Sequence, residues 1–234
     1  MGFQRDSDGD TVATMQSATR DLEKKEELLN FLTHGGGFLL ALGEAVVLFS
    51  SLSGVSDAAL RLSCCVYAAA LVALYGASTL SHSHAFASPD RRSFYRSLDQ
   101  GLIFVFIAAN FTPFAIAHLP GITCWLVLSL MWTLAVAGFT SKVFWRHRVE
   151  STSIVHYLAL GWLPIVVIVP ILRSMPMDGI VWFAAGGLCY TIGTIFLALD
   201  ERVRYFHAYW HLLVIAGSSC HYFVVLDYVI PLSS

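Results

Sequence analysis

Residues 206–230 read FHAYWHLLVIAGSSCHYFVVLDYVI, and this stretch combines the features that decide both the fold and the candidate site. From Leu212 onward it is almost wholly apolar and long enough to cross the ~30 Å hydrocarbon core of a bilayer as a helix. His207 and His211 are four residues apart, so a helix places both imidazoles on one face. Such a pair is half of a metal site. Alternatively, the two are interfacial histidines that hydrogen-bond to headgroups or backbone.

The composition is that of a helical membrane protein. The 234 residues are 56% hydrophobic and only 13% charged, whereas soluble domains carry about a quarter charged residues. No basic stripe suggests a nucleic-acid partner. The apolar runs are continuous rather than alternating, which indicates membrane helices. Seven such runs have the approximate limits 30–52, 60–82, 99–119, 122–141, 154–172, 179–199 and 207–230.

These runs predict an all-α, seven-transmembrane helix bundle with two parts. Residues 1–29 form a polar cytoplasmic tail, and residues 30–231 form the membrane domain. Within the tail, residues 6–10 are expected to be disordered and residues 18–29 to form an interfacial helix. Pro113, Pro164 and Pro170 are expected to kink their helices.

The basic residues predict the orientation of the bundle in the membrane. With seven crossings, 12 of the 14 Lys and Arg residues fall on one side, in the tail and in the second, fourth and sixth loops. The other side keeps only Arg61 and Arg173. The N-terminus is therefore predicted to be cytoplasmic and the C-terminus outside, opposite to the arrangement of G-protein-coupled receptors.

Five polar residues are predicted to share one layer at the cytoplasmic end. His207 and His211 begin the seventh run, His82 ends the second, and Asp99 begins the third. Ser78 lies one helical turn before His82, on the same face. Three histidines with one open position are the ligand set of a catalytic Zn²⁺ site, which Asp99 would support by orienting a water molecule. The alternative is a polar interfacial layer that binds no metal.

Several segments also resemble the hemolysin III family, of the progestin and adipoQ receptor (adiponectin receptor-like) group. The similar segments are Thr33-His34-Gly35, Ser78 to His82, Leu98-Asp99-Gln100, Ala109 to Pro113 and Phe206 to His211. The resemblance implies a seven-helix bundle with zinc on the cytoplasmic side, and it extends more distantly to the alkaline ceramidases. Two departures are Ser81, where bacterial members often have an aromatic residue, and Asn110, where many have a small one.

Two functions remain open. In the first, the protein is a zinc-dependent hydrolase in the plasma membrane, acting on ceramide-like lipid amides in lipid homeostasis. His82, His207 and His211 then bind the metal, Asp99 orients or deprotonates water, and Ser78 helps to hold the oxyanion. In the second, a receptor or membrane-state regulator contains a structural zinc. The ceramide-like amide is implied only by the resemblance.

Two further intramembrane residues have several interpretations each. His34, near the cytoplasmic end of the first run, lies either beside the metal ligands or in ordinary helix packing. Glu44 lies in the outer half of the same run, where an unpaired carboxylate is costly. It is therefore expected to be protonated, paired or facing a cavity.

Overall fold

The computed structural model describes residues 5–145 and 154–233, with side chains described for residues 14–145 and 154–231. All regular structure in these ranges is helical. The main helices are α1 (Arg5–Ser51), α2 (Ala58–Ser83), α3 (Pro89–His118), α4 (Gly121–Phe144), α5 (Ile154–Trp162), α6 (Ile168–Ser174), α7 (Met177–Leu199) and α8 (Phe206–Val224). The short helical segments are η1 (Leu52–Gly54), η2 (Leu163–Val167), η3 (Val225–Val229) and η4 (Ile230–Ser233).

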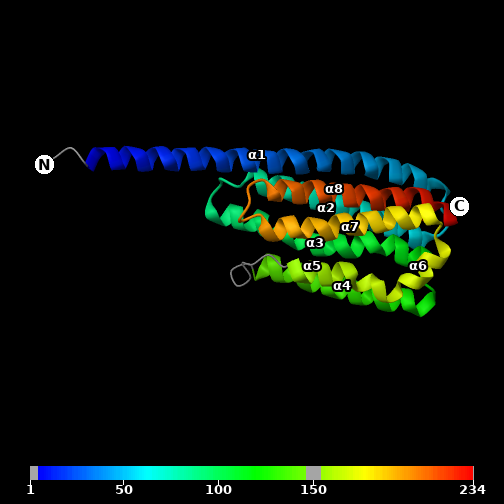
Figure 1. The fold of residues 1–234 in the computed structure, drawn as a ribbon. Helices are drawn as coiled ribbons and strands as arrows, with labels where there is room; N and C mark the ends of the chain where they lie inside the picture. The colour runs from blue at the N-terminus through cyan, green and yellow to red at the C-terminus, as the bar shows by residue number, and fades with distance from the viewer. Residues whose placement is uncertain (1–4, 146–153, 234) are drawn as a thin grey trace.

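Among the described residues, seven helical segments are long and apolar enough to cross a membrane. Six of them contain one of the helices α1 to α4, α7 or α8, while α5, η2 and α6 together form the fifth crossing. The segments lie side by side, and the two termini lie at opposite ends of the bundle (Figure 1). The predicted all-α, seven-helix fold is therefore confirmed.

Helix α1 is longer than its apolar run. It continues unbroken from Arg5 to Ser51, and its N-terminal part projects beyond the other helices (Figure 1). Residues 6–10, which were expected to be disordered, are helical because each added residue of a formed helix gains one backbone hydrogen bond. The helix also runs without a break across the predicted boundary between residues 29 and 30.

One other predicted boundary differs from the structure, whereas the predicted distortion of the helix at Pro164 is confirmed. Helix α3 begins at Pro89, so Asp99 lies ten residues inside the helix rather than at its start. The apolar run detected only the part of α3 that the hydrocarbon core would cover. The fifth crossing is broken at Pro164, where the chain continues as the 3₁₀ segment η2. Proline lacks the N–H that an α-helix needs at this point.

The packing of α1, α2, α3 and α8 positions the candidate site. In α3, 67% of the most apolar window is buried, more than in any other described crossing, so α3 is the central helix. Helix α1 packs against both α2 and α8. Side chains on one face of α1 can therefore reach residues on both neighbours.

Candidate metal centre

Three histidines from two helices converge at one end of the bundle. His82 lies in the last turn of α2, and His207 and His211 lie in the first turns of α8. One ligand atom from each lies within 4.8 Å of the other two, so the group could hold a metal ion. The ring centroids are 4.5 to 5.2 Å apart. The structure thus brings together the three histidines that the sequence predicted as ligands.

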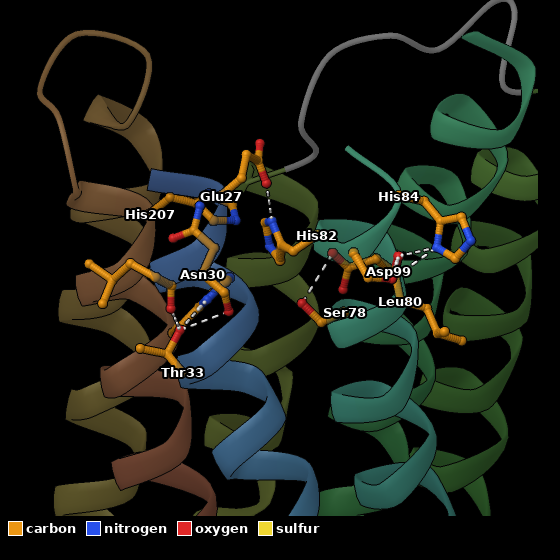
Figure 2. A network of polar contacts seen from close by, with 12 residues as sticks. Glu27, Asn30, Thr33, Ser78, Leu80, His82, His84, Asp99 and His207 are labelled. Atoms are coloured by element: carbon orange, nitrogen blue, oxygen red, sulfur yellow. Dashed lines mark hydrogen bonds and ion pairs between the residues drawn. The ribbon is translucent and has the colours of Figure 1, made fainter. Parts of the chain in front are cut away.

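Two of the histidines have carboxylate partners. The Nδ1 atom of His82 lies 2.8 Å from Oε2 of Glu27 on α1, and Nδ1 of His207 lies 2.7 Å from Oδ2 of Asp200, just after α7 (Figure 2 shows Glu27 and His82). A carboxylate accepts a hydrogen bond, so Nδ1 is the protonated nitrogen in both rings. This leaves Nε2 of each ring with its lone pair for a metal.

The third histidine is fixed by a hydroxyl group. Thr33 Oγ1 lies 2.9 Å from the carbonyl oxygen of Asn30 and 3.0 Å from that of Leu29, so its hydrogen is donated to the backbone. Its oxygen, 3.0 Å from Nδ1 of His211, must then accept from the ring. His211 is therefore also protonated on Nδ1, and its Nε2 is available as a ligand.

The donor set fits a metal ion. Histidines that bind metals usually donate their other ring N–H to a carboxylate, carbonyl or water. His82 and His207 each have a carboxylate acceptor, and His211 has the Thr33 hydroxyl in the same role. In addition, Nε2 of His82 is buried and has no hydrogen-bond partner among the described residues. A buried acceptor without a partner is costly, and a metal ion would satisfy it.

Asp99 and Ser78 lie beside the histidines but outside the three-residue group. Ser78 Oγ donates a hydrogen bond of 3.3 Å to Oδ2 of Asp99, which joins α2 to α3 (Figure 2). Ser78 is buried, while Asp99 is partly exposed and lines the same cavity as the histidines. The Ser78 hydrogen is thus directed at Asp99 rather than at the position predicted for an oxyanion.

The histidines open into a cavity of about 680 Å³. The end of the cavity at the three histidines is also lined by charged side chains, including Glu23, Arg92 and Glu201. Farther inside, the walls are mainly apolar and come from α3, α5, α6 and α7. Examples are Ile103, Phe106, Leu158, Ile168, Phe183 and Leu188. An apolar cavity that begins at a polar site suits an amphiphile whose head group lies among the histidines.

The hydrogen-bond partners of the three histidines were not among the residues predicted for the site. Glu27, Thr33 and Asp200 are separated from their histidines by 55, 178 and 7 residues. Asp200 could have been found as an acidic residue in the short loop before the seventh run. Glu27 precedes the first run by one turn, a position assigned to an interfacial helix.

Two other histidines, His34 and His84, lie near the three-histidine group and differ in their contacts. The His34 ring packs on that of His211 with centroids 3.5 Å apart, so His34 lies directly beside a candidate ligand. His84 faces a different direction, and its Nδ1 lies 3.0 Å from the carbonyl oxygen of Leu80 (Figure 2). In the outer half, Oε1 of Glu44 accepts a 3.5 Å hydrogen bond from Ser219, whereas its buried Oε2 has no hydrogen-bond partner among the described residues.

Known proteins are similar to this chain over most of its length. The family described as Haemolysin-III related matches residues 22–222. Hemolysin-3 of Bacillus cereus is 36% identical over 210 residues, covering 90% of this chain and 94% of that protein. The Hemolysin-3 homolog of Bacillus subtilis (strain 168) is 32% identical over 206 residues, covering 88% and 95%. Monocyte to macrophage differentiation factor of Homo sapiens is 26% identical over 167 residues, covering 70% and 69%.

Proposed function

Because this chain belongs to the haemolysin-III related family, we propose that it is a multi-pass membrane metalloprotein that hydrolyses ceramide-like lipid amides. The charge distribution of its loops favours a cytoplasmic N-terminus, and the membrane that we propose for it is the plasma membrane. The observation that carries the proposal is the position of three histidines, each with Nε2 available, at the polar end of an apolar cavity.

The donor set favours zinc. His82, His207 and His211 would provide three nitrogen ligands and leave a fourth position open, as in catalytic zinc sites. Imidazole also suits copper, iron and nickel, so metal analysis must decide the identity. When bound, zinc would polarise a carbonyl oxygen and lower the pKa of coordinated water toward about 7.

Asp99 and Ser78 would support the reaction from α3 and α2. The Asp99 carboxylate can accept a hydrogen bond from a water molecule, align it and take its proton. Ser78 would hold that carboxylate in place through its 3.3 Å hydrogen bond. The apolar walls would exclude bulk water and hold the acyl chain, so the substrate would be a membrane lipid.

A structural metal is the second candidate, and one observation favours it. The three histidines and their hydrogen-bond partners join α1, α2, α8 and the segment between α7 and α8. A metal there would tie together elements that are distant in sequence, as in a receptor or regulator of membrane state whose bundle shifts with a ligand.

The substitution Asp99→Asn separates the two candidates because it keeps the size of the side chain and removes its charge. A hydrolase should retain its metal but lose turnover by roughly 10²-fold or more, the range for loss of a general base. The measurement is release of free fatty acid from a panel of N-acyl lipids, together with metal content. Asp57→Asn is the matched control, because Asp57 caps α2 at the other end and asparagine caps equally well.

Two results would contradict the hydrolase proposal. One is equal fatty-acid release by the wild type, Asp99→Asn and metal-free protein. The other is absence of release from every lipid in the panel by protein that contains one zinc ion per chain. Either result would make the structural-metal candidate the better one.

A further inference from the structure

Asn110 and His221 form a buried polar pair deep in the cavity, and the proposed reaction does not use it. Both residues line the same cavity as the three histidines, with exposures of 8% and 5%. Asn110 follows Asp99 by eleven residues on α3, and His221 follows His211 by ten on α8. At 1.5 Å per residue, both helices place the pair roughly 15 Å from the level of the metal centre.

The hydrogen bonds of this pair fix the orientation of the Asn110 amide. Nε2 of His221 lies 3.0 Å from the carbonyl oxygen of Phe183, so Nε2 carries the hydrogen. In the neutral ring, Nδ1 is then an acceptor, and it lies 2.7 Å from Nδ2 of Asn110, which donates to it. Oδ1 of Asn110 is left as a buried acceptor with no hydrogen-bond partner among the described residues.

Tyr190 on α7 adds a second group without a partner. Its ring lies edge-on to His221 with centroids 5.4 Å apart, and it lines the same cavity. The Tyr190 hydroxyl is buried and has no hydrogen-bond partner among the residues whose side chains are described. Gly186 makes room for this arrangement, because a Cβ atom there would collide with the His221 ring.

We propose that Asn110, His221 and Tyr190 form a distal polar subsite that binds a hydroxyl group on the chain of the lipid ligand. An alcohol is the matching group because it can donate to Asn110 Oδ1 and accept from the Tyr190 hydroxyl. An unsubstituted acyl chain would leave both groups buried without partners, which is costly. The role of His221 is to hold the Asn110 amide in the orientation that leaves Oδ1 free.

The depth of the subsite determines where the hydroxyl should be. A fully extended chain advances about 1.2 Å per bond, as a peptide does over its three backbone bonds. A span of roughly 15 Å therefore corresponds to about 12 bonds from the group at the metal centre. The expected position of the hydroxyl rests on the proposed function in one respect, which is that the polar head of the lipid lies among the three histidines.

The test compares three fatty acids that bind to the purified, full-length protein. They are octadecanoic acid, its 12-hydroxy derivative and its 3-hydroxy derivative, which carries the same group near the metal centre instead. Affinities are measured by displacement of a fluorescent fatty acid. One or two additional neutral hydrogen bonds should make the 12-hydroxy acid bind roughly 10-fold more tightly than octadecanoic acid. The 3-hydroxy acid should show no such advantage.

Variants then assign the preference to the subsite. Tyr190→Phe removes only a hydroxyl that has no partner, so it should fold normally and reduce the preference to roughly threefold or less. Asn110→Leu should reduce the preference at least as much, and it should not weaken the binding of octadecanoic acid, because it removes an acceptor that the unsubstituted chain leaves without a partner. Tyr157→Phe is the matched control, because the Tyr157 hydroxyl also lies at the cavity but already donates to the carbonyl of Gln100 at 2.8 Å.

The proposal is overturned if wild-type protein binds the 12-hydroxy acid and octadecanoic acid equally. The pair would then serve only to hold α3, α7 and α8 together. It is also overturned if Tyr190→Phe keeps the full preference, and this variant decides the question should Asn110→Leu fail to fold. Because the readout is binding without hydrolysis, a failed amidase assay and a failed hydroxyl preference are separate results.

Discussion

Glu27 offers the sharpest test of the candidate metal centre, because it contacts the candidate ligand His82 and lies outside the three-histidine group. Its Oε2 accepts a 2.8 Å hydrogen bond from Nδ1 of His82, and the two side chains are 28% and 10% exposed. Removing the carboxylate in Glu27→Ala frees the His82 ring to rotate and makes it a weaker donor to a metal. Glu27→Gln keeps an acceptor oxygen but loses the charge.

The expected size of the effect follows from this contact. A hydrogen bond to a charged group contributes about 1.5–3 kcal/mol, and partial exposure favours the lower part of that range. Since about 1.4 kcal/mol is a factor of ten in Kd, Glu27→Ala should weaken zinc binding roughly 10- to 30-fold. Glu27→Gln retains a neutral hydrogen bond, so its loss should be smaller, roughly 3- to 10-fold.

The assay is competition for zinc between the purified protein and a chelator of known affinity, at fixed pH and ionic strength. Glu23→Ala is the control, because Glu23 lies one turn earlier on α1 and lines the charged end of the cavity. It should change the affinity by less than about threefold, the effect of a distant, screened charge. Equal losses of zinc affinity in the two alanine variants would rule out a specific role for the Glu27–His82 contact, since only the general charge of the cavity mouth would then matter.

Three other experiments test the candidate ligands, the topology and the start of α8. Replacing any one of the three candidate ligands with alanine should lower zinc content and thermal stability, whereas His84→Ala should change neither; metal analysis and thermal unfolding check this. Cysteine labelling at the two chain ends should place them on opposite sides of the membrane, and labelling of both from one side would contradict seven crossings. Glu26→Ala should weaken zinc binding roughly 3- to 10-fold. Glu26 Oε1 accepts a hydrogen bond from the backbone N–H of Tyr205, the N-cap residue of α8 with a φ of 66°, and so helps to position the start of the helix that carries His207 and His211. Tyr205→Gly in the same chain should restore part of the loss, because glycine adopts this conformation without strain; no recovery in the chelator assay would argue against a positioning role for Glu26.

Much of the candidate site was predictable because its main elements are local in sequence. The spacing of His207 and His211 requires only helical periodicity, and the position of His82 requires only the ends of the apolar runs and the count of crossings. Asp99 was assigned to the right level, although α3 begins ten residues earlier than its apolar run. Charged residues can continue a helix beyond the membrane, and hydropathy does not detect them.

An all-α membrane protein with seven crossings and a candidate layer of three histidines could be predicted from the sequence alone. Length, apolar composition and helical spacing suffice for this, because each crossing must satisfy its own backbone hydrogen bonds in lipid. The packing of the helices was needed to show which nitrogen of each ring is available, through partners such as Glu27 and Thr33 on α1. It alone also brought Asn110 and His221 together, 111 residues apart, at the deep end of the cavity. These contacts depend on how the helices rotate and pack against one another, and the period of a single helix contains no information about its neighbours.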